Sequence, residues 1–177
     1  MKKIGDALKY ISIMLLLLIV GFVTLYVAGV RVNTTKSIPV GFYQIIKKDP
    51  QIGDYVIFCP PNTAIFQEAK DRGYINVGNC EGELGYMMKK ILAAKKNHVE
   101  ITADGVVVDG VILPYSKSYT KDKAGRALQP YQMEGRELDN DELLLMSDVN
   151  PSSFDARYFG IIDVKQVDGV IKPIFVW

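Results

Sequence analysis

The amino-acid sequence predicts a mainly β domain carried behind one membrane-spanning helix. Residues 11–30 form an apolar segment without a charged side chain. The rest of the chain divides into short apolar runs separated by Gly, Pro and Asp, and Asp-Gly pairs, which favour tight turns, recur at 104–105, 109–110 and 168–169. With 177 residues in total, the chain has room for one anchor and one compact domain.

The apolar segment is long enough to cross a bilayer. At about 1.5 Å per residue it spans roughly 30 Å, the thickness of the hydrocarbon core. A buried core helix is one alternative, but a helix that is apolar on every face would need protein on all sides. The rest of the chain is too small to surround it. A cleavable signal peptide is the other alternative, because Val27-Ala28-Gly29 resembles a cleavage site, but the apolar run exceeds the usual length of such peptides. We therefore expect a retained transmembrane anchor at residues 11–30.

The basic residues that flank this segment predict its orientation. Three precede it and two follow it closely: Lys2, Lys3 and Lys9, then Arg31 and Lys36. The positive-inside rule therefore places residues 1–10 in the cytoplasm and residues 31–177 outside it, as in a single-pass protein of the inner membrane with a periplasmic domain. The 21 basic and 20 acidic residues are spread along the chain. Nucleic acid is not an expected partner, because no basic stripe for phosphates is present.

Within residues 31–177 we expect short strands, one helix and one polar excursion. The helix covers 64–72, with Asn62 or Thr63 as N-cap and Gly73 just beyond its end. Residues 116–137 are rich in Lys, Gln and Gly and predict an exposed, flexible excursion. Alternation and turn residues predict strands at 39–46, 55–58, 84–93, 98–102, 106–108, 111–113, 142–146, 158–164 and 170–175.

The two cysteines, Cys59 and Cys80, both lie in the part expected outside the cytoplasm. In an oxidising compartment we expect them to form a disulfide, which would contribute on the order of 3 kcal/mol. Two buried free thiols are the alternative. The single histidine, His98, is distant in sequence and the cysteines lack ligand spacing, so we expect neither a metal nor another cofactor.

Candidate catalytic groups are few. No G-x-S-x-G elbow, P-loop or H-E-x-x-H motif occurs, and His98 stands in a predicted strand as a lone polar residue. A serine hydrolase without histidine needs another base, and a buried lysine can serve if its pKa is lowered. Lys89 and Lys90 stand in the apolar run 85–92, where alternation places them on opposite faces. Periodicity alone does not choose between them.

Four motifs resemble the boxes of one family. Asn33-x-Thr35-x-Ser37-x-Pro39-x-Gly41-x-Tyr43 is similar to the nucleophile box of the TraF-type conjugative-transfer peptidases, a branch of the type I signal peptidases. Three further boxes follow in family order: Gly53-Asp54-Tyr55-Val56-Ile57-Phe58, then Met88-Lys89-Lys90-Ile91, then Ser153-x-Asp155-x-Arg157-Tyr158-Phe159-Gly160. Together they cover most of residues 33–160, which makes chance agreement improbable.

The resemblance implies a signal-peptidase-like β domain and a Ser-Lys dyad. It makes Ser37 the nucleophile and Lys89, the first residue of the family's basic pair, the general base. It implies that the Thr35 hydroxyl and the Ser37 N–H form an oxyanion hole, in which one donor is worth roughly 3 to 4 kcal/mol.

The last box supplies supporting residues by the same resemblance. Ser153 matches the family serine that orients the lysine, while Asp155 and Arg157 match a structural ion pair. Two departures stand out. Residues 93–97 read Ala-Ala-Lys-Lys-Asn where a Gly-Leu-Pro-Gly-Asp turn is usual, and the last box reads Asp155-Ala156-Arg157, preceded by Ser147-Asp148 in place of Gly-Asp.

We therefore expect a membrane-anchored serine endopeptidase. Its partners would be the lipid bilayer, a protein substrate cut close to the membrane, and components of a conjugation apparatus. The TraF resemblance implies a pilin-like substrate, released by hydrolysis or by cyclisation. A general signal peptidase differs from this reading only in its substrate. A non-catalytic β scaffold of a secretion or conjugation complex is the alternative from another class.

Overall fold

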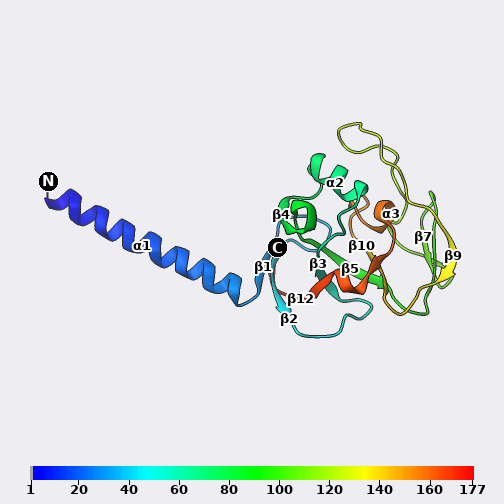
Figure 1. Ribbon diagram of the computed structural model, residues 1–177, viewed down its shortest axis with the longest axis horizontal. Helices are drawn as coiled ribbons and strands as arrows, with labels where there is room; N and C mark the ends of the chain where they lie inside the picture. Colours follow the sequence, from blue (N-terminus) through cyan, green and yellow to red (C-terminus); the bar gives the residue numbers. More distant parts are fainter. Residues whose placement is uncertain (1) are drawn as a thin grey trace.

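The structure, a computed structural model, describes residues 2–177. Helix α1 (Lys2–Val27) projects away from the β domain (Figure 1). By length and composition, its stretch Asp6–Val27 is the one helix among residues 2–177 suited to crossing a bilayer, and none of it is buried against protein. The helix ends three residues before the predicted boundary at residue 30, because Gly29 adopts a positive φ of 89° that turns the chain into the first strand.

The β domain contains two antiparallel sheets, so the predicted mainly β class is confirmed. The larger sheet has the order β1 (Val30–Asn33), β2 (Gly41–Ile46), β12 (Val167–Val176), β3 (Tyr55–Phe58), β5 (Met87–Ala93), β10 (Glu142–Met146), β11 (Ile162–Asp163). The smaller sheet has the order β8 (Val111–Ile112), β7 (Val106–Val108), β6 (His98–Ile101), β9 (Met133–Glu137). Strand β4 (Val77–Cys80) forms bridges with Leu84 only.

Helix α2 (Ala64–Asp71) lies where the sequence predicts it, with Thr63 at its N-cap. The expected strand 158–164 is wrong in its first half, because α3 (Ala156–Phe159) occupies it. The Asp155 carboxylate accepts a hydrogen bond from the Arg157 N–H at the start of this helix, and Gly160 ends it at φ 78°. Two short 3₁₀ turns, Glu81–Glu83 and Val164–Gln166, complete the helical content of the described chain.

The last strand differs most from its prediction. Asp168-Gly169 was expected to be a turn, but both residues lie inside the continuous strand β12, where the register with β3 shifts between Val167 and Gly169. Glycine within a strand often marks such a bulge or a close approach. Here a Cβ on Gly169 would lie 2.8 Å from the Ile45 side chain, which explains the requirement for glycine.

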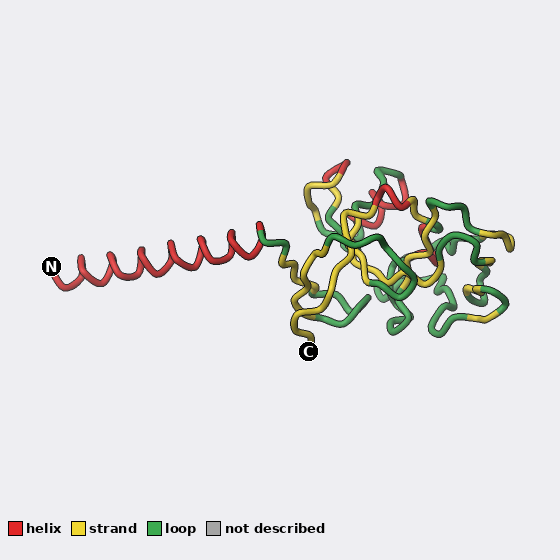
Figure 2. Tube along the Cα trace, turned by 90° about the horizontal axis from the view of Figure 1, so that it is seen from below, coloured by secondary structure: helices red, strands yellow, loops and turns green. Residues whose placement is uncertain are grey.

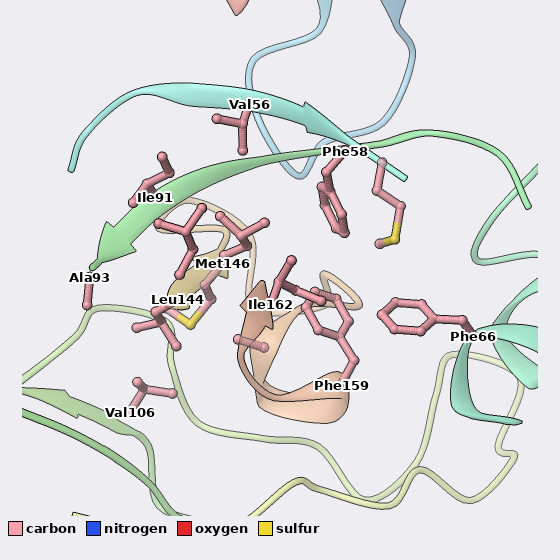
Figure 3. Close-up of a cluster of buried hydrophobic side chains, with 14 of the residues drawn as sticks. Val56, Phe58, Phe66, Ile91, Ala93, Val106, Leu144, Met146, Phe159 and Ile162 are labelled. Carbon is pink, nitrogen blue, oxygen red and sulfur yellow. The ribbon is translucent and has the colours of Figure 1, made fainter. Parts of the chain in front are cut away.

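The main core lies between the larger sheet and the helices α2 and α3 (Figure 3). Phe58 of β3 and Phe66 of α2 both pack against Phe159 of α3, with ring centroids 6.2 and 5.0 Å apart. A smaller cluster of Ile38, Tyr43, Ile57 and Ile171 lies apart from it. Since burial of each large apolar side chain contributes about 1.5 to 3 kcal/mol, this second cluster anchors the β1–β2 connection to the sheet.

Cys59 and Cys80 are joined by a disulfide, with their Cα atoms 5.5 Å apart. The bond closes the segment that carries α2 and β4. Residues 116–137 are mostly exposed, as expected, but they are not without structure: β9 forms their C-terminal part, and Lys121 and Ala127 form a β-bridge. The flexibility expected for this segment remains a prediction.

Candidate active site

Three segments from distant parts of the sequence meet at one cavity of about 280 Å³. Ser37 lies on the connection between β1 and β2, Lys89 in the middle of β5, and Ser153 on the loop between β10 and α3. All three side chains are buried, with Ser37 8% and Lys89 4% exposed, and all three line the cavity. The described chain therefore places the predicted nucleophile, base and orienting serine around a common space.

Asn33, at the end of β1, fixes the shape of the Ser37 connection. Its buried side-chain amide donates to the carbonyl oxygens of Thr35 (2.8 Å), Ile38 (3.1 Å) and Pro39 (2.9 Å). Its Oδ1 accepts from the backbone N–H of Thr35 at 3.1 Å. One side chain thus holds both flanks of Ser37, a role that the sequence analysis did not assign, although Asn33 stands first in the nucleophile box.

The Ser37 hydroxyl lies 3.0 Å from the hydroxyl of Ser153, within hydrogen-bonding distance. Among residues 2–177, no hydrogen bond joins the Lys89 Nζ to the Ser37 Oγ. In enzymes without substrate such contacts are often long, and they shorten when the substrate excludes water. The Ser37 backbone N–H has no acceptor within the described chain. It is therefore free to donate to a group in the cavity.

Lys89 is in an environment that favours its neutral form. Burial lowers the pKa of its ammonium from 10.5 to about 8, Asp155 partly opposes this lowering, and the positive charge of Arg157 adds to it. A neutral lysine amine can accept a proton. Lys90 lies on the other face of β5, where its Nζ forms a salt bridge of 2.6 Å with Asp148. Of the two lysines that the alternation could not separate, only Lys89 lines the cavity with Ser37.

Asp155 and Arg157 form a fully buried ion pair behind the cavity. The guanidinium donates to both carboxylate oxygens at 2.7 Å and also to the backbone carbonyl oxygens of Asn150 and Ser153. Asp155 also accepts from the Ser147 N–H at 3.1 Å. The pair therefore fixes the loop that carries Ser153, which agrees with the supporting role implied by the resemblance.

Thr35 lines the cavity, and its oxyanion role remains a prediction. Its side chain is exposed, and its hydroxyl donates to Asn33 Oδ1 at 3.0 Å. Because a hydroxyl carries a single proton, Thr35 would have to turn away from Asn33 to donate into the cavity. His98 lies exposed on β6 in the smaller sheet and does not line the cavity.

Sequence reasoning also missed one wall of the cavity. Tyr74, Ser152 and Phe154 line it, although none is a specified position of the four boxes. Tyr74 follows α2 and Phe154 precedes α3, so both become neighbours only through the tertiary fold. Phe154 lies between Ser153 and Asp155 in the last box, which is the one sequence signal that pointed to this wall.

Comparison with known proteins shows the family of this chain. The family described as "Signal peptidase, peptidase S26" matches residues 4–177. The chain is 49% identical over 177 residues to a plasmid transfer protein TraF of Escherichia coli, an alignment that covers 100% of this chain and 98% of that protein. It is 38% identical over 151 residues to a conjugal transfer protein TraF of Agrobacterium fabrum, with 84% of each chain covered.

Among solved structures, a signal peptidase I of Enterococcus faecalis V583 is similar with a TM-score of 0.40 and 21% identity, covering 71% of this chain and 98% of that one. The family match spans nearly the whole chain, and the E. coli relative aligns from end to end at close to half identity. This chain therefore belongs to the signal peptidase family, peptidase S26.

Proposed function

We propose that this protein is a membrane-anchored serine endopeptidase that uses Ser37 as nucleophile and Lys89 as general base. The observation that carries the proposal is the shared cavity, in which a buried lysine of lowered pKa and a serine hydroxyl held by Ser153 face the same space. The peptidase family of the chain agrees with this chemistry.

The reaction would be an acyl transfer. Neutral Lys89 accepts the Ser37 proton as the Ser37 Oγ attacks the scissile carbonyl carbon. The lysine then gives that proton to the leaving amine, and an ester joins the new C-terminal acyl group to Ser37. Water or a second amine attacks the ester, Lys89 takes its proton, and Ser37 is released with its hydroxyl restored.

The oxyanion would be bound by the Ser37 N–H and, after rotation, by the Thr35 hydroxyl. The free state of the Ser37 N–H supports the first donor. The second donor requires the Thr35 hydroxyl to exchange Asn33 for the oxyanion. An oxyanion in a water-poor site would be the stronger acceptor, and one such donor is worth roughly 3 to 4 kcal/mol in a transition state.

The surface around the end of α1 supports a position next to the bilayer. Six exposed apolar side chains of β1, β2 and the C-terminal end of the chain lie there: Val32, Phe42, Ile174, Phe175, Val176 and Trp177. The Trp177 ring lies 5.8 Å from those of both Phe42 and Phe175. Both views show this end of the chain, which pairs with β2, on the side of the domain where α1 joins it (Figures 1 and 2). Tryptophan is enriched at membrane interfaces, so this surface suits contact with lipid.

The substrate would be an exported protein cut close to its membrane segment. The TraF relatives are named for plasmid and conjugal transfer, so we assign the substrate to a conjugation apparatus, as a pilin-like or signal-bearing subunit. Residues 1–10 would lie in the cytoplasm and the β domain in the periplasm. Protease added to spheroplasts should then digest the domain after residue 31 and leave α1 protected, whereas protection of the whole chain would reverse the orientation.

The catalytic proposal is tested with a membrane-embedded pilin-like substrate from the same conjugation system. Ser37→Ala and Lys89→Ala should each abolish processing, while Lys90→Ala, which removes the neighbouring charge from outside the cavity, should retain most activity. Mass spectrometry of the product separates two outcomes, because a cyclic product is lighter than the linear one by one water molecule. Full processing by the Ser37→Ala variant would exclude Ser37 as the nucleophile, whereas no processing by the unmodified chain would support the non-catalytic scaffold.

A further inference from the structure

A second cavity adjoins the first. It has a volume of about 460 Å³ and lies under residues 119–128 of the polar excursion. Tyr74, Ser152 and Phe154 line both cavities, so the two cavities are neighbours with part of their lining in common. The excursion, the yellow-green loop in Figure 1, lies on the side of the domain remote from α1. An occupant of the second cavity would therefore lie next to the cavity that Ser37 lines, on the side of the domain away from α1.

Residues 119–128, which lie over the second cavity, are hydrogen-bonded to Arg72 and Tyr74, just beyond the end of α2. The Tyr74 hydroxyl donates to the Asp122 carboxylate, and the Arg126 Nε donates to the same carboxylate at 2.6 Å. Arg72, just beyond α2, donates to the Ala127 carbonyl oxygen, and Arg126 donates to the Arg72 carbonyl oxygen. These bonds, with the Lys121–Ala127 bridge, hold the hairpin over the cavity without contact from another molecule.

The floor of the cavity is aromatic. The rings of Phe154 and Tyr158 are stacked, with centroids 5.9 Å apart and planes 9° apart, and Tyr74 packs on Phe154 at 5.6 Å. The Tyr158 hydroxyl accepts a hydrogen bond from the Tyr119 N–H, which fixes the fourth aromatic residue at the rim. Such a floor favours an aromatic or bulky apolar side chain.

The rim is positively charged. Lys121, Lys123 and Arg126 line the cavity, against one acidic residue, Asp122, whose carboxylate is already engaged by Tyr74 and Arg126. Within residues 2–177, neither the Lys121 nor the Lys123 ammonium has a salt-bridge partner, and both side chains are exposed. Two free ammonium groups beside an aromatic floor complement a carboxylate next to an aromatic group.

We propose that this second cavity is a substrate subsite, which binds an aromatic or bulky apolar side chain and a neighbouring carboxylate of the peptide, at a fixed distance from the bond that is cut. This inference rests on the proposed function, since it assigns part of the substrate of that same site. Because both cavities are lined by Tyr74, Ser152 and Phe154, a peptide bound at Ser37 can continue into the second cavity. Lys121 and Lys123 select the acidic residue, and the aromatic floor selects its neighbour.

The test uses the full chain in detergent micelles and a synthetic peptide series. Each peptide has the same Ala/Ser backbone, and a Tyr-Glu pair is moved along it one residue at a time, with matched Tyr-Lys peptides. Cleavage rates are measured with the unmodified chain, and affinities with the Ser37→Ala variant. We expect one position at which Tyr-Glu is preferred over Tyr-Lys, and loss of that preference by about fivefold or more in Lys121→Glu/Lys123→Glu, since exposed ion pairs contribute up to about 1 kcal/mol each.

The control is Lys47→Glu/Lys95→Glu, which makes the same change in net charge at exposed lysines of two turns outside both cavities. It should leave the preference and the cleavage rate unchanged. Cleavage without positional preference, or a preference unaffected by Lys121→Glu/Lys123→Glu, overturns the subsite alone. Absence of both cleavage and binding for every peptide overturns the proposed function together with it.

Discussion

Asp155 and Arg157 face each other through two hydrogen bonds of 2.7 Å, and both side chains are completely shielded from solvent. A bidentate pair of this kind is the strong form of the carboxylate–guanidinium interaction. Removing one partner leaves the other charge buried without compensation, which makes the pair a sensitive point of the fold.

Arg157→Ala should therefore lower the free energy of unfolding by about 3 to 5 kcal/mol, because Asp155 would remain buried and unpaired. Urea unfolding followed by tryptophan fluorescence measures this loss. Arg136→Ala is the matched control, since its bidentate pair with Glu142 lies at the surface and should cost no more than about 1 kcal/mol. Equal losses in the two variants would contradict the buried pair's special role.

The pH dependence of the rate should follow Lys89. With a pKa of about 8, only the small neutral fraction of this lysine is active at pH 7, and that fraction grows as the pH rises through 8. Activity should therefore increase from neutral to mildly alkaline pH. Lys89→Arg should be as inactive as Lys89→Ala, because guanidinium does not lose its proton in this range. An acidic limb near pH 6.5 that disappears in His98→Ala would identify histidine as the base instead.

Burial of the charged Lys89 side chain should lower the free energy of unfolding at neutral pH. Its pKa is about 8 in the folded chain and near 10.5 when unfolded, so between these pH values the unfolded chain binds more protons, and stability rises with pH across this window. Lys89→Met removes the buried ammonium and should stabilise the chain by about 2 to 3 kcal/mol at pH 7, and by less near pH 10. Lys90→Met, which breaks a partly exposed salt bridge, should change stability by less than about 1 kcal/mol.

Asn33→Asp should disorder the connection that carries Ser37. A carboxylate cannot donate to the three carbonyl oxygens that the Asn33 amide now satisfies, and each buried group left without a partner costs about 1 to 3 kcal/mol. We expect a fall in kcat that exceeds the change in KM, together with lower stability. Asn140→Asp makes the same chemical change at an exposed turn and should be neutral in both measurements.

Loss of the Cys59–Cys80 disulfide should weaken the segment that carries α2. A closed loop of this length contributes on the order of 3 kcal/mol, so the urea midpoint should fall after reduction or in Cys59→Ala/Cys80→Ala. The unmodified chain should also migrate differently on gels with and without reductant. Identical midpoints before and after reduction would show that the bond is not formed in the isolated protein.

The sequence predicted elements well where local pattern and burial agree. Strands β3 and β10 have the expected bounds, and α2 lies between its predicted cap and terminating glycine. The pattern failed where tertiary contacts override it. Gly169 lies in a strand rather than a turn, where it allows the Ile45 side chain to approach the backbone. Tyr158 and Phe159 are apolar and typical of a strand, but they lie in α3, whose N-cap is Asp155.

The candidate site was predictable only in part. The family resemblance predicts which residues belong to the site, but only the folded structure shows how far apart they lie. Ser37, Lys89 and Ser153 do line one cavity, although their catalytic roles remain a prediction. The fixing of the Ser37 connection by Asn33 depends on contacts over two to six residues of an irregular segment, which no periodicity reveals. The wall formed by Tyr74 and Phe154 depends on two segments eighty residues apart in sequence, which meet only in the folded domain.

Strand β12 pairs with β2 on one side and with β3 on the other. In the hydrogen-bonded order of the larger sheet, the hairpin that carries Ser37 is therefore connected to β3 and β5, the strand of Lys89, through residues 167–176. During synthesis Ser37 emerges early, but the larger sheet is complete only after β12 has been made. The order of the strands therefore means that a chain shorter than residue 167 contains both Ser37 and Lys89 but lacks the strand that completes the sheet between them.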